Sequence, residues 1–234
     1  MSLGTSALRC DKRGPRGSFE GRSAVPQIAS DLVVDHILLD VIAAIRDSLE
    51  GALLEQQAVE ERFQVDVFLG DVSFETSYSL PGEGRPPRVR ADLALEWPTW
   101  SQSAYRSWSI GEPLPIPPEV SIELTLRLQR LAATPDKALV LAALGDDAPM
   151  TGTEPLVRDA LSLEERTEDD DTPPSYALDV PYHGSFKLNE TYLEEPDRLD
   201  AAMAPLGRWV ASALVRLADV DLPFLPAGEG GSSG

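Results

Sequence analysis

A run of alternating apolar and polar residues near the middle of the chain constrains the fold more than any other feature. From Val120 to Leu128 every second residue is apolar, and each residue between them is polar or charged. Successive side chains of a β-strand point to opposite faces of its sheet, so this period of two predicts a strand with one buried and one solvated face. Such strands are typical of an antiparallel sheet that packs on a core with one face.

Three further segments alternate in the same way and predict partner strands. Residues 63–78 alternate on both sides of Gly70, where a kink or bulge would let one long strand continue. The turn residues 81–84 separate this segment from a second strand over 89–97. Residues 176–188 supply the last strand. We therefore expect a four-stranded antiparallel sheet.

Two other segments have the period of an α-helix. Ser30 and Asp31 suit a helix start, and apolar residues then recur every three or four positions, which predicts a helix over 31–57. A second apolar stripe near the C-terminus consists of Leu206, Trp209, Val210, Ala213, Leu214 and Leu217. A helix with this stripe would bury it against the apolar face of the sheet. The predicted fold class is α+β, with the C-terminal helix packed on one face of the sheet and an additional N-terminal helix.

The remaining composition divides the chain into one domain and two tails. Residues 1–29 carry five basic and two acidic side chains among many Gly and Ser, which is typical of a disordered basic tail; an organellar transit peptide is the alternative. Residues 30–226 form the predicted domain, with the helix at 30–57 and an insertion at 132–175. Residues 227–234 are expected to form a flexible tail.

The insertion is expected to be helical and acidic. Thr134–Pro135–Asp136 opens a short apolar helix through Leu144, and 154–163 suggests a second helix. Residues 164–171 place six acids around one arginine, which is typical of a solvated loop. A metal site is the alternative, but consecutive aspartates lack the spacing of a calcium loop.

The charge of the chain limits its partners. It has 20 Lys and Arg against 39 Asp and Glu, a net charge of -19, which opposes binding to nucleic acid or to an anionic membrane surface. A basic protein surface is a suitable partner. A lone cysteine, Cys10, and the lack of an apolar run of roughly 20 residues favour a cytoplasmic protein. The preference for arginine over lysine suggests a bacterial source.

The usual catalytic motifs are missing from the sequence. His36 and His183 are isolated, and neither a Gly-x-Ser-x-Gly nucleophile motif nor a phosphate-binding loop occurs. We therefore expect a protein that is not an enzyme and that needs no cofactor or metal.

Several short motifs occur in the order in which they are found in the SecB family of cytosolic protein-export chaperones. Phe63-Gln64-Val65 followed by Asp71-Val72-Ser73-Phe74-Glu75 resembles the first strand of that family. The segments similar to its later strands, its long helix and its exit are 87–93, 120–128, 176–188, 205–208 and 222–226. The resemblance spans residues 63–130 and 176–226.

This resemblance implies an ATP-independent holdase that binds unfolded or partly folded client proteins and takes part in protein transport. It also implies acids at Asp71 and Glu75 that meet a basic partner such as an export motor ATPase. The family forms tetramers, and the unpaired edge of the first strand with the apolar stripe of the last helix predicts a homodimer or homotetramer. The alternative for these two acids is protection of an edge strand.

An aromatic, proline-spaced segment is the candidate client-binding lining of a SecB-like groove. Its aromatic residues are Trp97, Trp100, Tyr105 and Trp108. Rigid aromatic side chains give a large contact area and accept varied sequences. Alternatively, these four residues pack beneath a loop.

A second function stays open beside the holdase. Residues 31–79 also resemble the small domains that accompany bacterial trypsin-like proteases in signalling and defence systems. This likeness implies a non-catalytic adaptor or scaffold that binds one folded partner.

Overall fold

The structure is a computed structural model that describes residues 59–68, 71–112, 116–167, 173–189, 192 and 195–226, together with 43, 47 and 51. The two tails expected at 1–29 and 227–234 lie outside the described residues. Of the helix expected at 31–57, only Ala43, Asp47 and Gly51 are described, and all three are helical.

An antiparallel sheet forms the body of the protein, as the sequence predicts, but it has seven strands instead of four. Its order is β1-β2-β3-β4-β9-β7, and β8 also pairs with β9. The strands are β1 (Val59–Phe68), β2 (Asp71–Ser79), β3 (Val89–Trp97), β4 (Glu119–Leu131), β7 (Val157–Arg158), β8 (Ser162–Arg166) and β9 (Ser175–Lys187). A separate two-stranded sheet joins β5 (Met150–Thr151) to β6 (Glu154–Pro155).

The prediction of one long strand across Gly70 is wrong. β1 and β2 form an antiparallel hairpin in which Phe68 lies opposite Asp71 and Val65 lies opposite Phe74. Residues that lie opposite each other on neighbouring strands share one face. In a hairpin with a two-residue connection, the apolar positions change from odd-numbered residues in the first strand to even-numbered residues in the second. A bulge within one long strand changes the apolar positions in the same way. The hydrophobic pattern alone cannot distinguish the two arrangements.

The insertion contains one of its two expected helices. α3 (Lys137–Leu144) begins after Asp136, whose side chain accepts a hydrogen bond of 2.9 Å from the Ala138 amide. The helix expected at 154–163 is wrong, because this segment forms β6, β7 and the start of β8. Pairing of β7 and β8 with β9 satisfies their backbone groups, which outweighs local helix propensity.

The acidic run is also more ordered at its start than a solvated loop. Glu164 and Arg166 belong to β8, opposite Ala177 and Ser175 of β9. Residues 168–172 lie outside the described residues.

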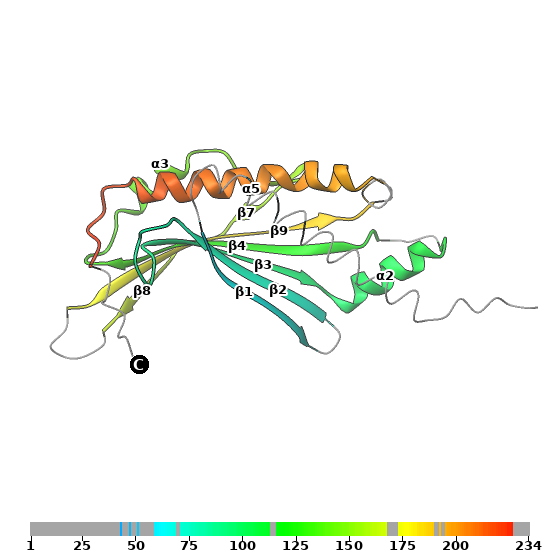
Figure 1. Ribbon diagram of the computed structural model, residues 1–234, viewed down its shortest axis with the longest axis horizontal. Helices are drawn as coiled ribbons and strands as arrows, with labels where there is room; N and C mark the ends of the chain where they lie inside the picture. Colours follow the sequence, from blue (N-terminus) through cyan, green and yellow to red (C-terminus); the bar gives the residue numbers. More distant parts are fainter. Residues whose placement is uncertain are drawn as a thin grey trace, which may run out of the picture.

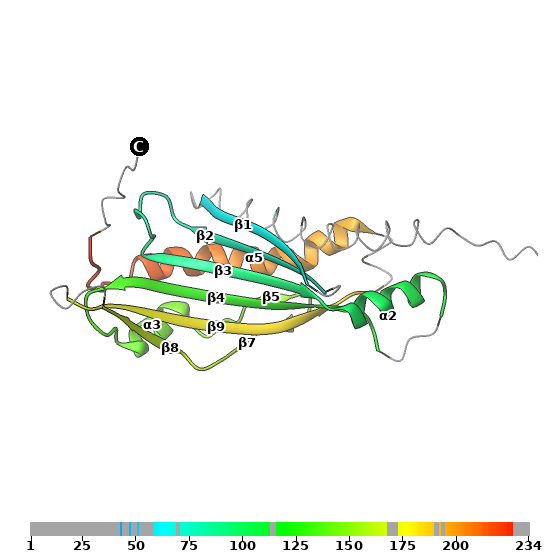
Figure 2. The ribbon, with the colours of Figure 1, turned by 90° about the horizontal axis from the view of Figure 1, so that it is seen from below.

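One long helix covers one face of the sheet. α5 (Pro196–Ala218) runs along the sheet, and the view from below shows no described helix across the opposite face (Figures 1 and 2). All six residues of the predicted C-terminal stripe are buried. Trp209 donates a 2.9 Å hydrogen bond from Nε1 to the Asp147 carbonyl and packs edge-on against Tyr182. None of the described helices is both long and apolar enough to cross a membrane.

The strand faces follow the predicted alternation. The apolar residues of β4 from Val120 to Leu128 are all fully buried, whereas Glu123 on the opposite face is exposed. Gly184 of β9 lies beneath the insertion, where an added Cβ would come within 2.6 Å of Leu156 Cδ2. The lack of a side chain at Gly184 therefore lets Leu156 pack closely on the sheet.

Replacing Leu124 by Ala should lower the free energy of unfolding by about 2–5 kcal/mol, because it removes a fully buried side chain and leaves a cavity. Its neighbour Thr125 points to the opposite face, so Thr125→Ala should change stability by no more than about 0.5 kcal/mol. Urea unfolding of both variants measures the difference. Equal losses would contradict the assignment of the two faces.

Candidate functional site

The aromatic segment forms a helix, α2 (Thr99–Ser109), which joins β3 to β4. It extends past the end of the sheet (Figure 2). Pro98 ends β3, and its carbonyl accepts hydrogen bonds from the amides of Ser101 at 2.9 Å and Gln102 at 3.1 Å. These bonds satisfy amides of the first helical turn that have no partner within the helix.

The Ser101 hydroxyl anchors α2 to the sheet. Ser101 is fully buried, and its Oγ accepts hydrogen bonds from Trp97 Nε1 at 3.0 Å and from the Glu119 amide at 2.7 Å. It donates one of 2.6 Å to the Glu119 carbonyl. One donor and two acceptor positions use the full capacity of a hydroxyl. One side chain thus links the end of β3, the start of α2 and the start of β4.

Two of the four aromatic candidates belong to the core. Trp97 and Tyr105 are 1% and 3% exposed, and their rings meet edge to face at 5.9 Å. Gln102 donates a 2.8 Å hydrogen bond from Nε2 to the Trp97 carbonyl. Trp97 and Tyr105 therefore do not line an open groove, because their rings are packed within the core. Burial of these two rings agrees with the alternative of internal packing, although the segment is the helix α2 and not a loop.

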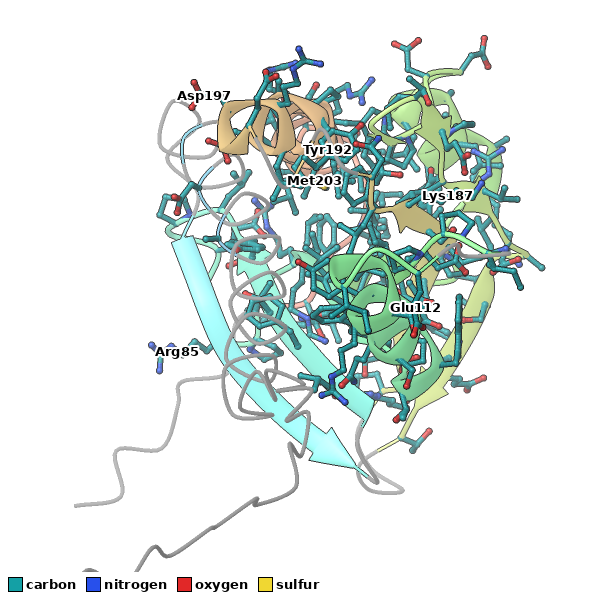
Figure 3. All side chains as sticks on the ribbon, turned by 90° about the vertical axis from the view of Figure 1, so that its right-hand side faces the viewer. Arg85, Glu112, Lys187, Tyr192, Asp197 and Met203 are labelled. Carbon is teal, nitrogen blue, oxygen red and sulfur yellow. The ribbon has the colours of Figure 1, made fainter. Side chains whose placement is uncertain are left out.

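Trp100 has a different position, with 46% of its surface exposed. Ile110 and Ile116, just after α2, are 70% and 58% exposed. We call Trp100, Ile110 and Ile116 the α2 apolar residues. The side chain of Trp108 lies outside the described residues. Figure 3 looks towards α2 and the exposed Glu112 that follows it.

Sequence reasoning missed Ile110 and Ile116, although a signal was present. Both isoleucines lie among Gly and Pro and belong to no periodic apolar pattern. An apolar residue without such a pattern has no sheet or helix face to bury it. The α2 apolar residues are therefore half of the six large hydrophobic residues that are exposed in the described part of the chain.

The two acids expected at a partner surface lie on an internal strand. Asp71 begins β2 opposite Phe68, and its side chain lies outside the described residues. Glu75 is exposed on the open face of the sheet, between Gln64 of β1 and Ala94 of β3. Because β1 pairs with β2, edge-strand protection does not explain Glu75.

A hollow of about 290 Å³ opens on this face of the sheet beside Glu75. Its charged lining residues are Glu75, Arg90, Asp92 and Glu123. Arg90 Nε lies 2.9 Å from Asp92 Oδ1, and Asp92 also accepts a hydrogen bond from the Ser77 hydroxyl. Acids outnumber bases in this hollow, which suits a basic partner.

Farther along the same face, Arg127 bridges two carboxylates. Its Nη1 lies 2.9 Å from Asp179 Oδ2, and its Nη2 donates to Glu164. Arg166 also donates to Glu164, with 2.7 Å between Nε and Oε1. Hydrogen bonds from Arg166 and Arg127 lower the pKa of Glu164 to about 2. Burial raises the pKa of Asp179, and Arg127 opposes this shift in part.

His183, which is isolated in the sequence, pairs with a carboxylate in the structure. His183 Nδ1 lies 2.8 Å from Asp159 Oδ2, and both side chains are about half exposed. His36 lies outside the described residues. Within the described part of the chain, no group of three or more His, Cys, Asp or Glu side chains could hold a metal ion. The sequence prediction that the protein is not an enzyme stays a prediction.

Comparison of the chain with protein-family models, curated proteins and solved structures gave no match. The likeness to the SecB family therefore rests on the sequence motifs alone.

Replacing Ser101 by Ala should lower the free energy of unfolding by about 1–3 kcal/mol, because it leaves buried groups of Trp97 and Glu119 without hydrogen bonds. Ser103→Ala is the matched control, since Ser103 is exposed on the same helix and bonds only the Thr99 carbonyl in the described structure. Thermal unfolding compares the two variants. A stable Ser101→Ala protein would contradict the anchoring role.

Stability should depend on Glu164 at low pH. Because the folded pKa of Glu164 lies near 2 and its ordinary value is 4.5, ionised Glu164 stabilises the fold above about pH 4.5. This contribution is lost as the pH falls towards 2. The difference in melting temperature between wild type and Glu164→Gln should therefore be present at pH 6 and shrink continuously below pH 4.5. A difference that does not change with pH would contradict the ion-pair network.

Proposed function

We propose that this protein holds unfolded or partly folded proteins without ATP, and that it contacts them through the α2 apolar residues. The observation that carries this proposal is the contrast within one short segment. Trp97 and Tyr105 are fixed in the core, whereas Trp100, Ile110 and Ile116 present their apolar surface to solvent. The SecB-like order of motifs supports the same function.

The anchoring of α2 suits such a role. A holdase must keep apolar side chains exposed without letting them collapse onto its own core. The Ser101 hydrogen bonds and the Trp97–Tyr105 contact hold one side of α2, so the exposed residues lose little further conformational freedom when a client binds. Trp100 gives the broad, rigid contact that accepts many sequences.

The charge of the chain would keep the loaded protein soluble. A homodimer or homotetramer would place several α2 segments around one client, and four chains would carry 4 × -19 = -76. Like charges of this size oppose aggregation of loaded complexes. Asp71 and Glu75, both on β2, would then meet a basic partner such as a motor ATPase.

The second candidate function is a non-catalytic adaptor for one folded partner. The network of Arg127, Glu164, Arg166 and Asp179 favours this alternative, because fixed charge pairs provide a surface of defined geometry. Binding of a folded partner to this network would depend on complementary charge and shape, and would not need exposed apolar segments in the partner.

Changing Trp100, Ile110 and Ile116 together to Ser should reduce suppression of aggregation of several unrelated denatured proteins, such as citrate synthase and rhodanese. Melting temperature should stay nearly constant because these side chains are largely exposed. Leu139→Ser is the matched control, since Leu139 is 52% exposed on α3. Trp97→Ser should instead cost about 3–5 kcal/mol of stability.

The two candidate functions predict different results in this assay. Unaltered aggregation suppression in the triple variant would exclude α2 as the client surface. If the wild-type protein protects none of the test proteins, the holdase proposal fails. Tight binding of one folded protein that is lost in Arg127→Gln would then support the adaptor.

A further inference from the structure

A second pocket lies at the end of β4 that is distant from α2. It has a volume of about 310 Å³, in the range of small-molecule sites. Three of its lining residues are arginines, Arg85, Arg130 and Arg166, and no acid lines it among the described residues. A concentration of arginine is unexpected in a chain with a net charge of -19.

Arg130 is held in an unusual backbone conformation. β4 contains one extra residue relative to β9 between Leu128 and Leu131, and Arg130 at this bulge has a φ of 60°. This left-handed region favours glycine and costs free energy for other residues. The Leu225 amide donates a 2.7 Å hydrogen bond to the Arg130 carbonyl, which fixes the conformation. The fold thus stores strain at a position that carries a charged side chain.

The Arg130 guanidinium has two donors without a hydrogen-bond partner in the described structure. Its Nε and Nη1 are buried and make no hydrogen bond. Glu83 directs its carboxylate elsewhere, since its Oε1 accepts from Arg88 Nη2 and its Oε2 accepts from the Val89 amide, both at 2.9 Å, and its charge offsets that of Arg130 only at a distance. Burial and the nearby Arg88 lower the pKa of Arg130. Buried donors without a hydrogen bond are costly even on a half-buried side chain, and a bound anion would reduce that cost.

The other lining residues indicate the chemistry of the part of the ligand that lies beyond its anionic group. Pro86, Leu225 and Pro226 give the pocket an apolar wall, and Ser175 and Tyr176 add hydroxyl groups. Arg85 extends outward from the ribbon, as Figure 3 shows, and is exposed at the rim. Arg166 shares Glu164 with Arg127, so its charge is neutralised in part.

We propose that this pocket binds the carboxylate or phosphate group of a small, partly apolar molecule, with Arg130 as its principal anion-binding residue. Guanidinium groups match the oxygens of both anions. Ligand binding would supply the hydrogen bonds that Nε and Nη1 of Arg130 lack in the empty protein. The inference is independent of the holding function proposed for α2.

Isothermal titration calorimetry of the full chain tests this site with benzoate, phenyl phosphate and the neutral benzamide. At low salt, at least one of the two anions should bind about tenfold or more tightly than benzamide, and the tighter one identifies the anion class. Arg130→Gly should weaken this binding at least about tenfold. Arg208→Gln should not weaken it, although it removes the same charge, because Arg208 is an exposed residue of α5 outside the pocket.

Thermal unfolding separates binding from structure. Glycine adopts a φ of 60° without strain, so Arg130→Gly should melt no lower than wild type. If Arg130→Gly does not fold, Arg130→Asn replaces it, since Asn tolerates the left-handed region. Anion binding that survives the Arg130 substitution, or falls equally in Arg208→Gln, would overturn the proposal.

Residues 168–171 are four acids that precede the lining residue Pro173 in the sequence, and negative charge opposes anion binding. A variant with Glu168→Gln and Asp169, Asp170 and Asp171→Asn is titrated in parallel. Failure of both this variant and the wild type to bind either anion up to about 10 mM would also overturn the proposal.

Discussion

Burial of the single apolar face of the sheet beneath α5 is the interaction on which the rest of the structure depends. The alternate residues of β3, β4 and β9 are largely buried, and the apolar stripe of α5 covers them together with Val140, Leu144 and Leu156 of the insertion. Because each strand has one apolar and one polar face, one covering layer completes the core. The opposite face of the sheet therefore carries charged residues such as Glu75, Arg127 and Asp179, and Arg127 and Asp179 form an ion pair there.

β4 positions both surfaces for which a role is proposed. Its first residue, Glu119, binds the Ser101 hydroxyl that anchors α2, and its penultimate residue, Arg130, faces the arginine-lined pocket. A strand of 13 residues spans about 40 Å, so the two surfaces lie at opposite ends of the sheet. They differ in chemistry as well, since one is apolar and the other basic. A substitution at one surface therefore changes no direct contact of the other surface.

Prediction from the sequence succeeded where one residue pattern had one physical solution. The alternation of β4 and the stripe of α5 were predicted residue by residue, because burial follows directly from the period. The hairpin at Gly70 was not predicted, since a bulge and a two-residue connection shift the alternation equally. The strands at 154–166 were missed because they pair with β9, a strand close in space. For the aromatic segment, composition predicted a binding surface but could not separate core Trp97 and Tyr105 from exposed Trp100.

The sequence by itself determined the α+β class, the antiparallel sheet and the helix that covers it, because local period decides which side of each element is apolar. It also determined the strongly acidic charge. The tertiary structure alone decided which aromatic side chains are buried, which strand is the edge, and that Arg85, Arg130 and Arg166 line one pocket. These properties depend on contacts between residues far apart in the chain, such as Ser101 with Glu119 and Arg130 with Leu225, and a local pattern carries no information about them.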